Sequence, residues 1–328
     1  MGYIELKTGQ VALRPSVSPP DWQTMTMPTK LADNIVFGNG KFVIVGSTYY
    51  PNQPSQTTFT YSTDGKNWAT TQVAGLYDRI GAGGGKFVAL GSGATGVYST
   101  DGVSWETMTM PFSGSWSSIT YGNGRFLATA SYAASESDPT TFEETNKCAY
   151  SLDGIHWETS VLPDTGRWGC ASYGNNTFVA LPDDSSVIAY SPDATTWDYS
   201  FTFKYSINAC NVFSKDRFIV LAVSRNTLST DHGIYSFDGK SWNEFDLPSD
   251  SRWEEVVYGN GRFLAFGVGS DKETLVGALS TDGKVWKPMT LPSLQPQGSI
   301  YAAYGNDRVV VVVNYTNTAL YWDLSSKN

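Results

Sequence analysis

Two short motifs alternate along the whole chain, and this repetition constrains the fold more than any other feature of the sequence. The first motif has a Y-G-N-G-R-F-like core, and its seven copies begin at Val36, Gly81, Thr120, Ser172, Val212, Val257 and Ala303. The second follows Y-S-x-D-G-x-x-W and covers residues 61–68, 98–105, 150–157, 190–197, 235–242 and 279–286, with a degraded copy at 320–324. The copies are roughly 37 to 52 residues apart, a period typical of β-propeller blades.

Each repeat predicts four antiparallel strands. The G-N-G tripeptide favours the positive φ angles of a tight hairpin turn between the first and second strands. The D-G pair favours a second tight turn, between the third and fourth strands. Prolines follow several of the fourth strands and are expected to stop the ladder, because proline has no N–H to donate; they are Pro111, Pro163, Pro248 and Pro292. The sequence therefore predicts an all-β, seven-bladed propeller with four strands per blade.

The two ends of the chain predict how the ring closes. Residues 21–28 nearly duplicate the fourth strand at 104–111, whereas the C-terminus stops after a third strand near Tyr321. We therefore expect residues 22–28 to supply the outer strand of the last blade, which removes an exposed sheet edge. The propeller would span residues 21–328, and residues 1–20 would form a separate leader or docking arm.

Composition excludes several classes of function. The 31 acidic and 22 basic residues give a net charge of −9, and no basic stripe is present, so we expect no nucleic-acid partner. No apolar run is long enough to span a membrane, and the N-terminus lacks the apolar core of a signal peptide. The protein is expected to be synthesised in the cytoplasm without membrane insertion.

The Y-S-x-D-G-x-x-W repeats resemble the Asp-box of sialidase-type (BNR) propellers, although Asp-boxes usually carry one more residue between Asp and Gly. Together with Y-G-N-G-R-F, they look similar to propellers of tailed-phage tail and virion proteins. This resemblance covers nearly the whole chain and implies the fold more specifically than the function.

The repeated aspartates could be catalytic or could bind calcium, as the alternative to a structural role. Calcium needs about six to eight oxygens at one point, whereas each turn offers one carboxylate. We therefore interpret them as acceptors of backbone N–H bonds within their own turns, with the following tryptophans filling space between blades. The aspartates are Asp64, Asp101, Asp153, Asp193, Asp238 and Asp282.

Catalytic constellations are not evident in the sequence. The resemblance implies that a sialidase would need three clustered arginines, but Arg125, Arg217, Arg262 and Arg308 share a turn position with Lys41 and Lys86 and are interpreted as solvated. The remaining Arg79, Arg167, Arg225 and Arg252 do not align into a triad. His156 and His232 are the only histidines, and no metal or cofactor motif occurs. The prediction is a protein that is not an enzyme and has no cofactor or metal.

Recognition is expected on the face that carries the long loops between second and third strands, because loops on rigid scaffolds usually bind. Aromatic residues and arginines there are the candidate contacts, although the tryptophans could instead plug the channel where the inner strands converge. The candidates are Tyr49, Tyr50, Trp116, Tyr132, Phe142, Arg167, Trp168, Arg225, Arg252 and Trp253.

These observations favour a non-catalytic phage virion protein of the tail or adsorption apparatus. It would bind other virion proteins through the leader or the loop face, or a host-surface glycan or protein. A sialidase-like glycoside hydrolase and a bacterial assembly factor or secreted adhesin remain alternatives.

Overall fold

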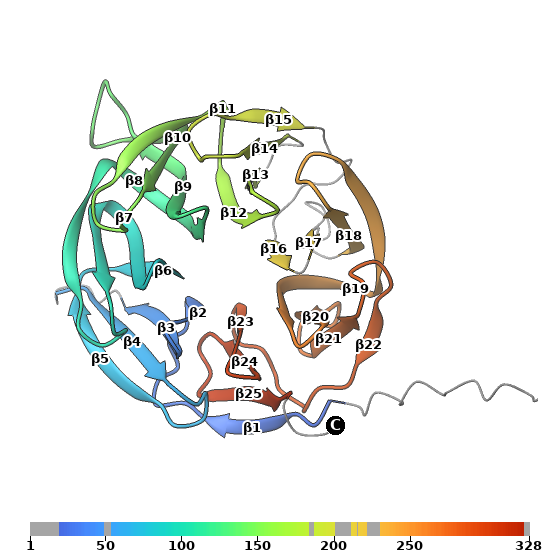
Figure 1. Ribbon diagram of the computed structural model, residues 1–328. Coiled ribbons are helices and arrows are strands. Elements are labelled where there is room, and N and C mark those ends of the chain that lie inside the picture. The colour runs from blue at the N-terminus through green and yellow to red at the C-terminus, as the bar shows by residue number, and fades with distance from the viewer. Residues whose placement is uncertain are drawn as a thin grey trace, which may run out of the picture.

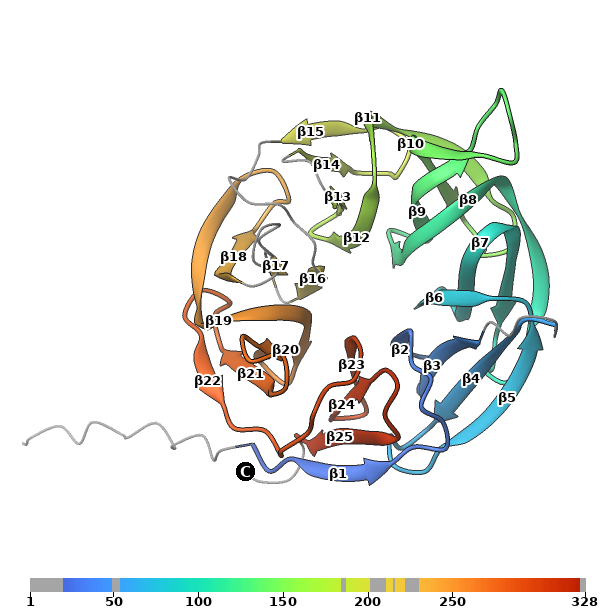
Figure 2. The ribbon, with the colours of Figure 1, turned by 180° about the vertical axis from the view of Figure 1, so that it is seen from behind.

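The computed structural model describes residues 20–48, 54–183, 187–200, 211–214, 216–221 and 230–324. Within these residues it is an all-β propeller whose sheets stand around a central axis (Figures 1 and 2). The leader prediction at 1–20 lies almost entirely outside the described residues.

Three of the sheets have four antiparallel strands each. The first pairs in the order β1 (Gln23–Thr26), β25 (Thr318–Asp323), β24 (Arg308–Val313) and β23 (Ile300–Gly305). The second contains β2 (Asn34–Gly38), β3 (Lys41–Thr48), β4 (Gln56–Ser62) and β5 (Ala69–Ala74). The third contains β12 (Trp168–Gly174), β13 (Thr177–Pro182), β14 (Ile188–Ser191) and β15 (Asp198–Ser200).

Two larger sheets complete the ring. The six-stranded sheet contains β6 (Tyr77–Gly83), β7 (Lys86–Ser99), β8 (Glu106–Gly122), β9 (Arg125–Ala134), β10 (Phe142–Ser151) and β11 (Glu158–Gly166). The seven-stranded sheet contains β16 (Asn211–Ser214), β17 (Arg217–Leu221), β18 (Thr230–Ser236), β19 (Trp242–Gly259), β20 (Arg262–Gly269), β21 (Leu275–Ser280) and β22 (Lys287–Met289).

Counted by hydrogen-bonded sheets, the propeller has five blades, and the prediction of seven is wrong. The reason is the length of β8 and β19, which have 17 and 18 residues. Each runs from the outer strand of one sequence repeat directly into the inner strand of the next. Met108 of β8 thus pairs with β7, whereas Ile119 of the same strand pairs with β9. Each of the two larger sheets therefore contains two sequence repeats.

Proline does not end these long strands as the sequence predicted. Pro111 lies within β8 and Pro248 within β19, each in a segment where the pairing register of the strand shifts. No ladder hydrogen bond is required of proline at such an irregularity. The backbone stays extended through it, and the two repeats become one sheet.

The N-terminal strand closes the ring. β1 pairs antiparallel with β25, from Gln23 opposite Tyr321 to Thr26 opposite Thr318 (Figures 1 and 2). Trp22 anchors this strand in the core, with its ring centroid 5.7 Å from those of Phe266 and Trp322. The first strand of the chain is thus the outer strand of the last sheet.

Aromatic packing between neighbouring repeats forms the core. Trp105, at the end of one D-G turn, stacks on Phe59 of the preceding repeat with ring centroids 3.8 Å apart. The glycine in Y-G-N-G also has a packing role: a Cβ at Gly122 would overlap the ring of Tyr173 on the next repeat. This explains why glycine occupies a position inside a strand, where it is otherwise unfavourable.

Candidate binding site in the central channel

Four of the inner strands begin with the same irregularity, and it directs side chains towards the channel. A buried aromatic residue starts the strand, and the pairing register shifts across the residue that follows it. Such β-bulges reorient a side chain and occur often beside functional sites. The aromatic residues are Tyr77, Trp116, Trp168 and Trp253, and the bulged residues are Asp78, Ser117, Gly169 and Glu254.

The structure buries Trp116, Trp168 and Trp253, the three tryptophans predicted to contact a ligand, at the start of their inner strands. Their exposed fractions are 2%, 1% and 0%. Their indole N–H groups donate to the backbone carbonyls of Gly93 on β7, Asp164 on β11 and Ser249 on β19, respectively. These bonds hold the start of each inner strand, and the cavity is lined there by Trp253 and by the residues that follow the three tryptophans.

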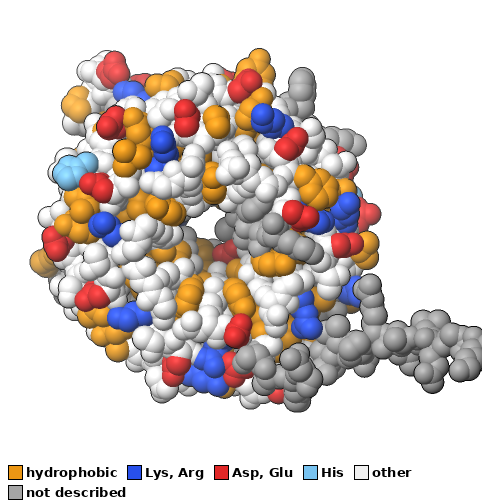
Figure 3. All heavy atoms as spheres, in the orientation of Figure 1, with side chains coloured by type: hydrophobic (Ala, Val, Ile, Leu, Met, Phe, Trp, Pro, Cys, Tyr) orange, Lys and Arg blue, Asp and Glu red, His pale blue; other side chains and the backbone are white. Residues whose placement is uncertain are grey.

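The inner strands enclose a cavity of about 740 Å³ on the ring axis. Figure 3 shows it as a hole through the centre of the molecule. Its charged and phenolic lining residues come from segments far apart in the sequence; they are Arg79, Tyr173, Asp183, Arg252, Glu254, Glu255 and Tyr301. Only Arg252 among these was predicted as a binding residue.

Arg79 is held by the neighbouring repeat. Its Nε donates to the carbonyl oxygen of Ser117 at 2.8 Å, and its Nη1 donates to the carbonyl oxygen of Asp78 at 3.0 Å. The Asp78 carboxylate lies 3.5 Å from Nη1, and its Oδ1 is buried without a hydrogen-bond partner among the described residues. Burial raises the pKa of Asp78, against the lowering effect of Arg79. The guanidinium is therefore fixed in orientation at the channel wall.

Glu254 connects two repeats on the other side of the channel. Its Oε1 lies 2.5 Å from Nε of Arg252, and its Oε2 accepts the N–H of Ile300 at 2.8 Å. Burial raises the pKa of Glu254, although both of these donors act in the opposite direction. Arg252 itself remains 45% exposed.

Tyr301 lies between these two groups of charges. Burial raises its pKa to about 12, and the charges of Arg79, Asp33 and Glu254 also act on it. The phenol is therefore neutral at physiological pH, and a side-chain hydrogen bond with Ser299 partly opposes this effect of burial. It completes a mixed site of two guanidinium groups, carboxylates and a phenol.

The remaining predicted contacts lie away from this cavity or outside the described residues. Arg167 approaches the β9–β10 hairpin, where its Nη1 donates to the hydroxyl of Tyr132 at 3.4 Å and its Nε lies 4.0 Å from Glu144. Phe142 is 42% exposed on β10 of the same hairpin. Tyr49, Tyr50 and Arg225 lie outside the described residues.

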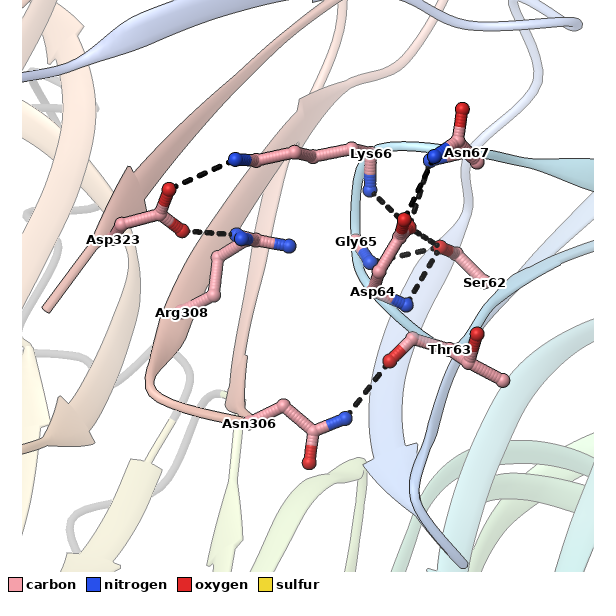
Figure 4. A network of polar contacts seen from close by, with 9 residues as sticks. All are labelled: Ser62, Thr63, Asp64, Gly65, Lys66, Asn67, Asn306, Arg308 and Asp323. Carbon is pink, nitrogen blue, oxygen red and sulfur yellow. Dashed lines mark hydrogen bonds and ion pairs between the residues drawn. The ribbon is translucent and has the colours of Figure 1, made fainter. Parts of the chain in front are cut away.

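The repeated aspartates lie at the opposite end of the channel, in turns that we call the Asp turns (residues 62–67 and their equivalents). Oδ1 of Asp64 accepts the N–H groups of Lys66 and Asn67 and the hydroxyl of Ser62, as Figure 4 shows. The same contacts recur at Asp101, Asp153, Asp193, Asp238 and Asp282. Their carboxylates are thus engaged within their own turns.

The residues missed by sequence reasoning are Asp78, Arg79, Glu254 and Tyr301. One signal was present: polar or charged residues directly follow an aromatic residue and directly precede the apolar strand in two repeats. The bulge that points them at the channel has no mark in the sequence. Within the described residues, no group of three or more His, Cys, Asp or Glu side chains could hold a metal ion. No helix in that part of the chain has the length and hydropathy needed to cross a membrane.

No protein-family model and no curated protein matches the chain. Solved structures are similar to it in fold. A streptogramin B lyase aligns with a TM-score of 0.71 and 9% identity, covering 92% of this chain and 97% of the lyase. YCF48 from Cyanidioschyzon merolae aligns with a TM-score of 0.64 and 14% identity, covering 92% of this chain and 98% of YCF48. Virginiamycin B lyase from Staphylococcus aureus aligns with a TM-score of 0.68 and 9% identity, covering 92% of this chain and 99% of the lyase.

These neighbours correct the prediction of a phage tail or virion protein. The structures named above are lyases and YCF48, and none is a phage virion protein. At 9% to 14% identity they show a shared propeller fold alone. The sequence repeats are turn and packing signals of that fold, and they carry no information about a virion.

Proposed function

We propose that this protein is a ligand-binding propeller without catalytic activity, which holds a small molecule in its central channel. The observation that carries the proposal is the shared bulge, which places Glu254 and Arg79 beside the same cavity from repeats on different sheets. Pockets with a few convergent polar groups are the usual sites of small-molecule binding. The cavity volume of about 740 Å³ suits such a ligand.

Catalysis is the second candidate, because two of the structural neighbours are lyases. Glu254 favours it to some degree, since burial raises the pKa of this carboxyl. However, both oxygens of Glu254 are occupied by protein donors. The described lining of the cavity also contains no histidine, and it contains two arginines where a sialidase-type site would need three. A binding role needs no further group.

The experiment is a thermal-shift screen of the purified protein against a library of small metabolites. Ligands that raise the unfolding temperature are titrated by calorimetry against Arg252→Gln, with Arg262→Gln as the matched control. Arg262 lies at the turn end, 5.4 Å from the ring of Trp322, outside the cavity. We expect Arg252→Gln to weaken binding about tenfold or more, whereas Arg262→Gln leaves it unchanged.

Each ligand is also recovered after incubation and analysed by mass spectrometry. An unchanged mass and structure is expected of a binding protein. Turnover abolished by Glu254→Gln would instead establish an enzyme, and ligands that bind Arg252→Gln as well as the original protein would place the site elsewhere.

A further inference from the structure

The carboxylates of the cavity are already satisfied by the protein. Glu254 uses one oxygen for Arg252 and the other for the N–H of Ile300. Glu255 is buried, and its Oε1 accepts the N–H of Val256 at 3.0 Å. Asp183 also has an interaction partner. A ligand would have to compete with these internal donors to reach the acidic groups.

The two arginines, in contrast, have donors to spare. A guanidinium carries five N–H donors in a planar fork. For Arg252, Nε alone is paired, and among the described residues neither Nη has a partner. For Arg79, Nε and Nη1 are engaged, whereas Nη2 has no partner within the described part of the chain. The side chain of Arg79 is 33% exposed and that of Arg252 is 45% exposed, so that solvent or a ligand reaches both.

We infer that the channel ligand carries a carboxylate group, which pairs with the open Nη groups of Arg252 or Arg79. This inference rests on the proposed function and names the chemical class of its ligand. A carboxylate can form two parallel N–H···O bonds with the two open Nη groups of Arg252, whereas Arg79 offers Nη2 alone. The contacts that Ser117 and Glu254 make with the two Nε atoms hold these side chains in place before binding, which lowers the entropic cost of binding.

The position of the acidic groups adds selectivity. Glu254 is less accessible than Arg252, with its side chain 15% exposed against 45% for the arginine. Both residues line the cavity, but the arginine is the more accessible of the two charges. A cationic ligand would meet the guanidinium first, at a cost from like-charge repulsion.

The test uses three small probes of different charge at constant ionic strength: acetate, its neutral isostere acetamide, and the cation methylammonium. Arginine Nε–H resonances of the ¹⁵N-labelled full chain are followed by NMR and assigned with Arg79→Lys and Arg252→Lys. We expect acetate to shift the Arg252 or Arg79 resonance saturably and acetamide to leave both unchanged. Arg262, at the turn end, is the internal control. Succinate should repeat the acetate result, with about tenfold weaker binding in Arg252→Gln.

Three results would overturn the inference in distinguishable ways. If methylammonium shifts the two resonances and acetate does not, the ligand class is wrong, while a small-molecule site in the channel stands. If no probe acts on either arginine and the metabolite screen also finds no channel ligand, both the class and the proposed function fail. Equal acetate shifts at Arg262 and at the channel arginines would show non-specific ion pairing and would also reject the inference.

Discussion

At the scale of single residues, the basic side chains after two of the G-N-G turns have a role beyond the predicted one. Lys41 donates to the carbonyl oxygen of Asp101 at 2.7 Å, and Arg125 donates to that of Asp193 at 2.6 Å. In both cases the acceptor belongs to the Asp turn of the next repeat. These partly exposed side chains therefore also join neighbouring repeats, and Lys and Arg alternate because either can reach a neighbouring carbonyl. A sequence shows such an exchange without showing the acceptor.

The Asp turns predict how stability depends on pH. Hydrogen bonds from the N–H groups of Ser104 and Val103 lower the pKa of Asp101. At Asp153, burial opposes the hydrogen bonds of His156 and Ile155, yet the pKa is again lowered. The unfolded chain, with aspartate pKa values of about 3.9, then binds more protons than the folded chain. The stabilisation is present above pH of about 4 and is lost as the pH falls through the lowered folded values.

We therefore expect the free energy of unfolding, measured by urea titration, to decrease steeply below pH of about 4. The double variant Asp101→Asn/Asp153→Asn should be less stable at neutral pH and should lose less stability on acidification. An unchanged slope in this variant would mean that other carboxylates cause the acid sensitivity.

Trp105 provides a second test at this scale. Replacing it with alanine removes the ring stacked on Phe59, and we expect a loss of about 3–5 kcal/mol in the free energy of unfolding. Urea denaturation followed by circular dichroism measures this loss. Tyr199→Ala is the control, since Tyr199 is 60% exposed and should change stability by less than about 0.5 kcal/mol. A similar small effect at Trp105 would contradict its role in joining two repeats.

At the scale of elements, the closing strand is the one long-range pairing that the sequence predicted. Residues 21–28 resemble the fourth strand at 104–111, although they lie at the N-terminal end of the chain, far from the last repeat. β1 supplies that strand, and without it β25 would present an unpaired edge. Exposed edges of this kind promote association between chains.

Deleting residues 1–28 should therefore lower the urea midpoint of unfolding and produce oligomers by size-exclusion chromatography. A deletion of residues 1–19 keeps the whole of β1 and Trp22, and serves as the matched control. If the longer deletion stays monomeric and as stable as the control, β1 contributes nothing to closure.

Local signals predicted local structure well and the larger arrangement less well. The turns at Asn39 and Gly65, with φ of 47° and 66°, follow directly from their residue types. The number of sheets did not follow, because nothing in the sequence around Pro111 or Pro248 shows that the backbone stays extended there. Of the residues that line the cavity, Arg252 and Trp253 were named from the sequence as binding residues. The bulge before Arg79 and Glu255 arises from the packing of whole strands, which short motifs do not encode.

At the scale of the whole molecule, the candidate site exists only when the ring is closed. Arg79 lies on β6, Glu254 on β19 and Tyr301 on β23, in three different sheets. Side-chain amides tie the repeats together at the turn end: Asn39 donates to the carbonyl of Thr100 and Asn306 to that of Thr63. At the seam between the last and first sheets, Asp323 also bridges Lys66 and Arg308 (Figure 4). The geometry of the channel therefore depends on the contacts between all neighbouring repeats of the ring.

The bulged inner strands have a consequence for how this protein can change over time. At the turn end, geometry narrows the choice of residue to asparagine, glycine, serine and aspartate at most positions, although Ala194 occupies one glycine position with a φ of 60°. At the channel, the bulged residues Ser117, Gly169 and Glu254 differ from one another while the same ladder continues behind them. Mutations there alter what the channel holds without altering how the ring is built. One end of the molecule is thus free to acquire new specificities while the other end preserves the scaffold.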